Sequence, residues 1–204
     1  MAYPTVSAPY GFQPINRQDG MVYAGATTQY GIASVSTTIK NGDLVYVSAG
    51  VIVKSGVTNN AVSTANLTAG VFMGCQYVNT QGQTVQAQYY PGNAAASSAI
   101  AYVVVDDKAA YKVAVTDGSG NVSSTTVKAI GVNLAVDQTN TGSTVTGDSG
   151  AGVTAPSANA GNLVHLPVKV IGVVPETGNA TNFSEVIVIL NNPQLTRTTG
   201  NDFA

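Results

Sequence analysis

Short apolar runs rich in valine and isoleucine recur along this chain of 204 residues, and each run ends at a turn-forming residue. β-Branched side chains fit a pleated, half-buried surface, and runs of this length match ordinary strands. No long window repeats apolar residues at the three-and-four spacing of an amphipathic helix. The sequence therefore predicts an all-β fold, an antiparallel β-sandwich or barrel of the jelly-roll or β-tulip-like kind. The clearest runs are residues 43–47, 51–54, 100–105, 111–115 and 186–190.

Two of these runs predict how strands pair. Residues 43–47 and 51–54 are joined by Ser48-Ala49-Gly50, a short loop with a glycine, which is typical of a β-hairpin. Residues 186–190 are apolar on both faces of a strand. Such a strand is expected at the centre of a sheet, covered on both sides, or with one face against a partner subunit.

Alternation predicts which side chains face the core in two further strands. In residues 70–78, strict alternation places Val71, Met73 and Cys75 on one face and Phe72 on the other. In residues 84–90, the same rule points Tyr89 inward, with Gln86 and Gln88 outward.

The chain divides into an extended N-terminal arm, residues 1–27, and a single β-rich domain, residues 28–204. Prolines at positions 4, 9 and 14 favour extended backbone in the arm. Residues 137–162 consist mainly of Thr, Gly, Ser, Asn and Ala, with few large side chains. This Ser/Thr/Gly-rich segment predicts a long surface loop without a core of its own.

Aromatic side chains are concentrated in the arm, which is too short to form its own core. They pack either on the domain of the same chain or on a neighbouring subunit, because exposed aromatic patches tend to mark interfaces. If they contact a neighbour, deletion of residues 1–20 should abolish that contact and leave the fold intact. The candidate contact residues, including two phenylalanines near the C-terminus, are Tyr3, Tyr10, Phe12, Tyr23, Phe183 and Phe203.

The residues needed for catalysis are poorly represented. Residues 147–150, Gly-Asp-Ser-Gly, match the nucleophile motif of trypsin-like serine proteases, but in that fold the histidine precedes the serine, and His165 follows it. The lone Cys75 would need an oriented base, and on an alternating strand it is more often a small buried apolar residue. Zinc sites take three or four protein ligands, which His165 and Cys75 do not supply. We therefore predict a non-enzymatic protein with no catalytic residue, metal or cofactor.

The charge pattern limits the classes of partner. Charged residues make up 9% of the chain, against about a quarter in typical domains. The eight basic residues are scattered from Arg17 to Arg197, so no phosphate-neutralising patch for nucleic acid is predicted. The longest apolar run is too short to span a membrane, and no signal peptide is recognisable. We expect synthesis in a cytoplasm, no direct nucleic-acid or membrane partner, and a low-charge surface that favours self-association.

Stretches at both ends of the chain resemble a group of tailed-phage virion structural proteins. At the N-terminal end these are Gly11-Phe12-Gln13-Pro14-Ile15, Asp19-Gly20 and Asn41-Gly42-Asp43-Leu44-Val45. At the C-terminal end they are residues 170–174, 185–189 and 191–195 together with Asn182. The Gly-Asp-x-Val pattern of residues 42–45, followed by the hairpin to Lys54, is also similar to short capsid-decoration domains. Residues 55–162 match the group in rhythm only.

The resemblance implies a cement or decoration protein on the exterior of a phage capsid. It also implies a homotrimer whose partner is the major capsid protein of the same virion, with synthesis in the host cytoplasm. A tail or neck position in the virion stays open. A carbohydrate-binding β-sandwich is the alternative from another class, because Gln86, Gln88, Tyr89 and Tyr90 form a cluster suited to stacking on and hydrogen-bonding a sugar.

Overall fold

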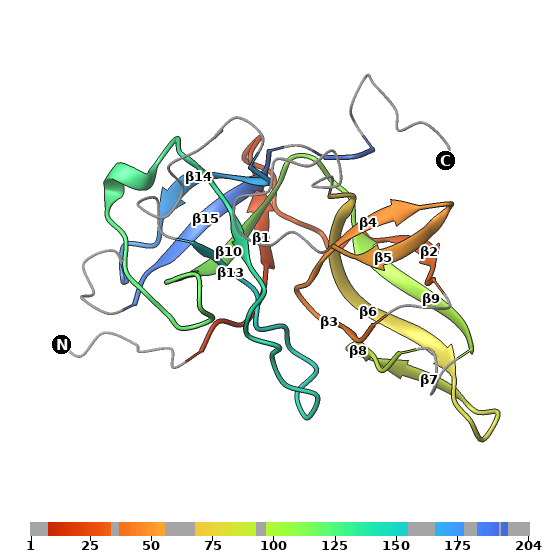
Figure 1. Cartoon of the computed structure of the whole chain (residues 1–204). Helices are drawn as coiled ribbons and strands as arrows, with labels where there is room; N and C mark the ends of the chain where they lie inside the picture. The colour runs from red at the N-terminus through yellow and green to blue at the C-terminus, as the bar shows by residue number, and fades with distance from the viewer. Residues whose placement is uncertain are drawn as a thin grey trace.

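The structure, a computed structural model, describes residues 8–33, 37–55, 68–92, 97–154, 166–177, 183–191 and 193–195. The regular elements of these residues are almost all β-strands, and most of the strands belong to two main sheets that lie side by side (Figure 1). The predicted all-β fold is therefore confirmed. In the described part of the chain, no helix has both the length and the apolar character to cross a membrane.

The seven-stranded sheet holds the strands on the left of Figure 1, and the six-stranded sheet those on the right. The seven-stranded sheet contains β1 (Gln13–Arg17), β10 (Ala109–Thr116), β11 (Asn133–Leu134), β12 (Val136–Asp137), β13 (Gly152–Thr154), β14 (Val168–Val173) and β15 (Glu185–Leu190). The six-stranded sheet contains β2 (Thr28–Gly31), β4 (Leu44–Ser48), β5 (Val51–Lys54), β6 (Gly70–Val78), β7 (Thr84–Ala87) and β9 (Ser97–Val104). The remaining elements are β3 (Ile39–Lys40) paired with β8 (Tyr89–Tyr90), and the 3₁₀ helix η2 (Val127–Ala129).

The seven-stranded sheet nearly closes into a barrel. Its strands follow the order β11, β14, β15, β10, β13 and β12, and only Ala135 separates the first strand of this path from the last. The backbone N–H of Thr154 in β13 donates to the Ala135 carbonyl oxygen at 3.0 Å, which links this corner to the sheet. Most pairs are antiparallel, as predicted, but β10 and β13 run parallel. β15 lies between β14 and β10, so the central position predicted for residues 186–190 is confirmed.

Two clusters of buried apolar residues form the core. The larger joins the barrel strands to Leu44, Val71 and Val104 of the six-stranded sheet, so side chains from both sheets pack in it. The smaller lies on the other face of the six-stranded sheet and includes Phe72 and Tyr90. β6 therefore supplies core residues on both of its faces.

A β-bulge in β6 interrupts the alternation of side chains that the sequence predicted. Val71 and Met73 pack with the larger cluster, but Cys75 packs with Phe72 in the smaller one, on the face opposite to that predicted. The pairing with β9 shifts register between Phe72 and Gly74. Gly74 has φ +146°, and a Cβ there would lie 3.1 Å from the Ala87 carbonyl oxygen, so the extra residue of the bulge requires glycine at this position.

The alternation predicted for residues 84–90 is correct only in its first half. Val85 and Ala87 are half-buried in β7, and Gln86 is exposed. At Gln88 the chain bends, and Tyr90 instead of Tyr89 enters the core, where it meets Tyr77 edge-on at 6.3 Å between ring centroids. Tyr89 is half-buried like Val85 and Ala87, but it is not part of the core cluster that Tyr90 joins, because the bend ends the two-residue period.

The hairpin of β4 and β5 is confirmed, with Ser48 opposite Val51. Its two loop residues, Ala49 and Gly50, have φ +49° and +80°. Positive φ at both central positions is the type I′ geometry that matches the twist of a hairpin. It suits Gly50, but it strains the Cβ of Ala49.

We expect Ala49→Gly to raise the free energy of unfolding by about 1 kcal/mol, because glycine adopts this backbone conformation without steric strain. Urea unfolding of the parent and the variant measures the difference. Gly50→Ala is the matched control and should destabilise the protein. A loss of stability in Ala49→Gly would contradict the type I′ assignment.

Two predicted boundaries need correction. Residue 27 does not separate an arm from a domain, because β1 pairs with β10 and Phe12 is fully buried in the larger cluster. The predicted loop 137–162 is ordered in much of its described part. Residues 152–154 are strand β13, and residues 147–151 are buried apart from half-buried Asp148. Residues 155–162 lie outside the described residues.

Candidate functional site

In the arm, the described aromatic side chains pack against the body of the protein, whereas three aliphatic side chains are exposed. Phe12 is the aromatic residue that is fully buried. Its ring is fully buried and meets Tyr111 of β10 edge-on, with 6.4 Å between centroids and an interplanar angle of 81°. Gly11 and Phe12 donate backbone hydrogen bonds to Ala151 and Gly42, which hold the ring in place. Phe12 is therefore a core residue, and its predicted place on a contact surface is wrong for this fold.

Tyr10 is held by a charged pair on the barrel. Its hydroxyl donates to Glu185 Oε1 of β15, and Lys112 Nζ of β10 lies 3.2 Å from the same oxygen. The Lys112 ammonium also stands 5.5 Å from the centroid of the Tyr10 ring, a cation–π distance. Burial and the hydrogen bond to the Glu185 carboxylate raise the pKa of Tyr10. The half-buried Tyr10 thus ties the arm to two barrel strands.

The other predicted contact residues are divided between the core and undescribed parts of the chain. Tyr23 packs half-buried against the larger cluster, and its hydroxyl donates to the Ala26 carbonyl oxygen at 3.0 Å. Phe183 is buried, so it is a core residue rather than a surface contact. Tyr3 and Phe203 lie outside the described residues.

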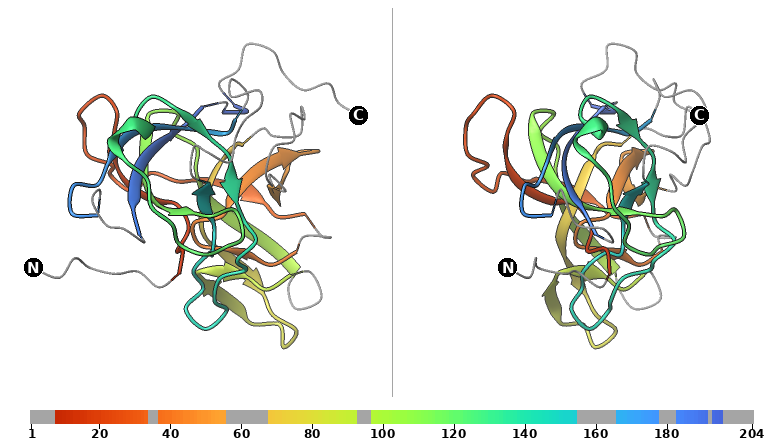
Figure 2. Two further views of the ribbon diagram at one scale, coloured as in Figure 1. Left: turned by 60° about the vertical axis from the view of Figure 1, so that its left-hand side comes forward. Right: turned by 90° about the vertical axis from the view of Figure 1, so that its left-hand side faces the viewer.

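The outward side of the arm is aliphatic. Ile15, Met21 and Val22 are 40%, 62% and 80% exposed, within eight residues of one another. They belong to the segment from Gln13 to Tyr23, which we call the N-terminal hairpin. Its turn stands out from the body of the protein in Figure 2, as the red loop that follows β1. Of the eight large hydrophobic side chains that are exposed among the described residues, this hairpin holds three.

A β-bulge explains the exposure of Ile15. The register of β1 against β10 shifts between Pro14 and Asn16, so Ile15 has no partner on β10. Exposed apolar groups gathered on one segment tend to mark interaction sites. The sequence signal for this surface was the apolar pair Met21-Val22 directly after the Asp19-Gly20 turn, and the prediction overlooked it in favour of the aromatics.

Polar contacts fix the turn of the N-terminal hairpin. Arg17 N donates to the Met21 carbonyl oxygen at 2.9 Å, and Gly20 closes the turn with φ +82°. The Arg17 guanidinium lies 3.1 Å from Asp19 and 3.3 Å from Asp106, next to β10. Because these contacts hold the turn against the barrel, the exposed aliphatic side chains are presented on an ordered element.

A shallow hollow adjoins the hairpin. It has a volume of about 300 Å³ and is lined by Asn16, Arg17, Gln18 and Gly20 on one side and by Ile171, Gly172 and Ile187 on the other. Ile171 and Ile187 are half-buried on β14 and β15. The residues of the hairpin that line this hollow lie between Ile15 and Met21 in the sequence. We call the exposed aliphatic groups and this hollow together the hairpin surface.

The serine of the protease-like motif has a structural role. Ser149 of the protease-like motif is buried, and its Oγ donates to Asp43 Oδ1 at 2.6 Å. The Asp43 carboxylate also accepts from Lys40 N at 2.8 Å and pairs with Lys54 Nζ at 2.8 Å. Asp43 is therefore the centre of a buried network that anchors the segment around Ser149 to the six-stranded sheet.

The thiol and the metal-ligand candidates give no reactive arrangement. Burial raises the pKa of the Cys75 thiol to about 12, so it is protonated at neutral pH and is a poor nucleophile. His165 lies outside the described residues. In the described ranges, no three His, Cys, Asp or Glu side chains are grouped closely enough to hold a metal ion.

The sugar-binding cluster suggested by the sequence is not assembled on one surface. Tyr90 is buried in the smaller cluster, where it packs against Tyr77. Gln86 and Gln88 are exposed, and Tyr89 is half-buried. The two tyrosines that adjoin each other in sequence therefore do not form one stacking platform.

The comparisons with known proteins add no relative. No family model matches the chain, and no match was found among the curated proteins or the solved structures.

Proposed function

We propose that this chain is a non-enzymatic structural protein of a tailed-phage virion, which binds the outside of the capsid shell and stabilises it. Its partner is the major capsid protein of the same virion, and the chain self-associates as a homotrimer on the capsid lattice. The observation that carries the proposal is the hairpin surface, an ordered apolar contact surface on an all-β protein of low charge. The resemblance of the two chain ends to virion structural proteins supplies the class of partner.

The physical basis is the addition of many weak contacts. Three exposed aliphatic side chains bury too little area for tight binding by one subunit. When many copies bind one shell, and copies also contact each other, each further contact is effectively intramolecular. A low net charge keeps repulsion between neighbouring copies small. A decoration layer of this kind strengthens the shell without any chemistry.

The direct test is the position of the chain in the particle. Cryo-electron microscopy of virions that contain this protein should show its density in symmetric clusters on the exterior of the head. Density on the tail or neck would mean that the chain has a structural role other than cementing the capsid. Particles without any density for the chain would overturn the proposal.

We expect Val22→Asp to weaken binding to capsid shells at least tenfold. The change removes an aliphatic contact worth about 1.5–3 kcal/mol when buried, and it places a charge in the interface. Co-sedimentation of the variant with shells assembled from the capsid protein measures the loss. Because Val22 is 80% exposed, the melting temperature should stay within about 2 °C of the parent.

Val145→Asp is the matched control. Val145 is 95% exposed in the segment between β12 and β13, outside the N-terminal hairpin. The same substitution there should leave shell binding unchanged. If Val22→Asp binds as the parent does, or if both variants lose binding equally, the hairpin surface is not the contact site.

A further inference from the structure

Lys40 is a nearly buried lysine without an acidic partner. The residue is 6% exposed, and its Nζ donates to the backbone carbonyl oxygen of Thr141. Among the described residues it forms no ion pair, since the nearby Asp43 carboxylate is paired with Lys54. Lysine is almost never fully buried unless it is paired, because an uncompensated charge is costly away from water. Among the described residues, the Lys40 Nζ therefore has a backbone carbonyl as its partner and no carboxylate.

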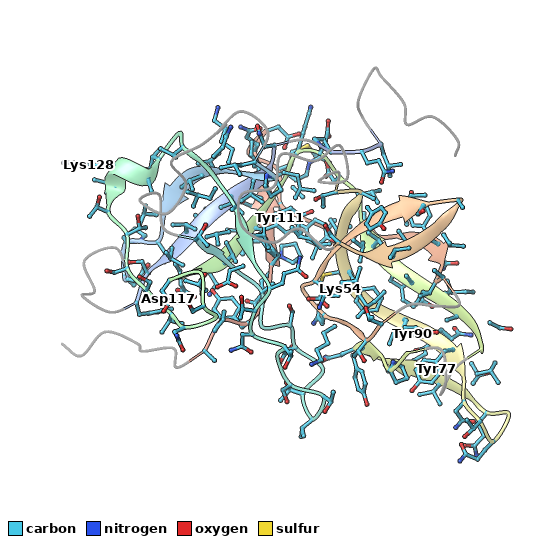
Figure 3. All side chains as sticks on the ribbon, in the orientation of Figure 1. Lys54, Tyr77, Tyr90, Tyr111, Asp117 and Lys128 are labelled. Atoms are coloured by element: carbon cyan, nitrogen blue, oxygen red, sulfur yellow. The ribbon has the colours of Figure 1, made fainter. Side chains whose placement is uncertain are left out.

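The same lysine lines a hollow of about 340 Å³ beside β3 and β5. Figure 3 shows Lys54, the second basic residue of this hollow, at the junction between the two sheets. The other lining residues that the structure describes are uncharged and polar, and four of the five carry a hydroxyl group. They are Thr37, Thr38, Gln138, Thr141 and Thr144.

The lining determines the class of ligand. The ammonium group of Lys40 suits a carboxylate, because a charge-assisted hydrogen bond is about twice as strong as a neutral one. Threonine hydroxyls both donate and accept, so they suit a ligand body with several hydroxyl groups. Among the described residues, the lining contains no aromatic or acidic side chain, which argues against an apolar or cationic ligand. A bare inorganic anion would leave most of the polar lining without a contact.

From this geometry we infer that the hollow binds a carboxylate-bearing sugar of the hexuronic acid class. The carboxylate lies against Lys40, and the sugar hydroxyls lie against the threonines. This site is distinct from the hairpin surface, and it is independent of the proposed role on the capsid. Loss of shell binding and loss of sugar binding therefore have separate tests.

The experiment is an isothermal titration calorimetry measurement on the full chain. Glucuronate, glucose and sulfate are the three probes, each titrated separately. Glucuronate should bind at least tenfold more tightly than either glucose, which lacks the charge, or sulfate, which lacks the sugar body. Lys40→Met keeps the aliphatic stem and should weaken glucuronate binding at least tenfold. Lys128→Met, at an exposed lysine of η2, is the matched control and should leave binding unchanged.

A second variant tests the hydroxyl contacts without disturbing the buried lysine. Thr144 is exposed, so Thr144→Val should fold as the parent does and weaken glucuronate binding several-fold. Sulfate binding as tight as glucuronate would overturn the sugar assignment. Failure of glucuronate to bind, or equal loss in Lys40→Met and Lys128→Met, would overturn the site itself.

Discussion

Replacement of Phe12 by alanine is expected to lower the free energy of unfolding by about 3–5 kcal/mol, the usual cost of removing a buried phenylalanine ring. The ring is fully buried and packs edge-on against Tyr111, in the cluster that joins both sheets. For a domain of this size the melting temperature should fall by about 10 °C.

Chemical denaturation of the parent, Phe12→Ala and Met21→Ala measures this effect. Met21 lies on the same segment but is mostly exposed, so its truncation should change stability by about 0.5 kcal/mol or less. If Phe12→Ala had an equally small effect, Phe12 would be a surface residue available for contact and not a core residue. The structure also corrects the expectation for deletion of residues 1–20. Removing Phe12 and β1 takes away part of the core, so the fold would not be left intact.

The second large effect is expected for Asp43→Ala, which should destabilise the protein by about 3 kcal/mol. The carboxylate is 1% exposed and has three partners, Ser149 Oγ, Lys54 Nζ and Lys40 N. Removing it leaves a buried hydroxyl and a backbone N–H without an acceptor, and it leaves Lys54 without its counter-charge. Each of these losses is unfavourable, because the position that the Asp43 carboxylate occupies is only 1% exposed.

Thermal unfolding of Asp43→Ala and Asp148→Ala provides the comparison. Asp148 is half-buried, and its carboxylate accepts no hydrogen bond within the part of the chain that the structure describes. Its replacement should therefore change stability by less than about 1 kcal/mol. Lys54→Met, which removes only the ion pair, should fall between the two aspartate variants. Equal effects of both aspartate variants would contradict the central role of Asp43.

Local features of the fold were predictable, and contacts between distant segments were not. The hairpin of β4 and β5 depends on Ala49-Gly50 and its flanking runs, all within twelve residues. The position of Phe12 depends on Tyr111, about one hundred residues later, and no pattern within the arm reports that partner. The prediction correctly recognised that the arm aromatics need a surface, but it assigned some of them to the wrong one.

The segment 137–154 shows why composition alone misled the prediction of a loop. From composition, its small residues were expected to form no core. In the structure, atoms of neighbouring segments lie so close to the backbone of two of its glycines that a side chain would not fit. A Cβ on Gly150 would lie 2.4 Å from Asn140 Oδ1, and one on Gly152 would lie 2.3 Å from Thr116 Cγ2. Close backbone packing and flexible loops both favour glycine and alanine, so the sequence did not distinguish them.

The candidate site was predictable only in part. The sequence predicted a contact surface within residues 1–27, and three exposed aliphatic side chains lie in that range. The identity of the outward residues was missed, because the bulge at Ile15 reverses the alternation of β1 and because the aromatics find partners on β10 and β15. The hollow lined by Lys40 could not be predicted from the sequence, because its described lining residues come from three separate segments of the chain.

The central position of β15 has a consequence for the timing of folding during translation. β15 is the most C-terminal of the described strands, and it pairs with both β14 and β10 inside the barrel. The barrel core therefore stays open until residues 185–190 have left the ribosome. At roughly 5–20 residues per second, β1 waits about 10–30 s for that event. During this interval the apolar strands are exposed to other nascent chains, so coverage by chaperones on the ribosome should determine the yield of folded protein.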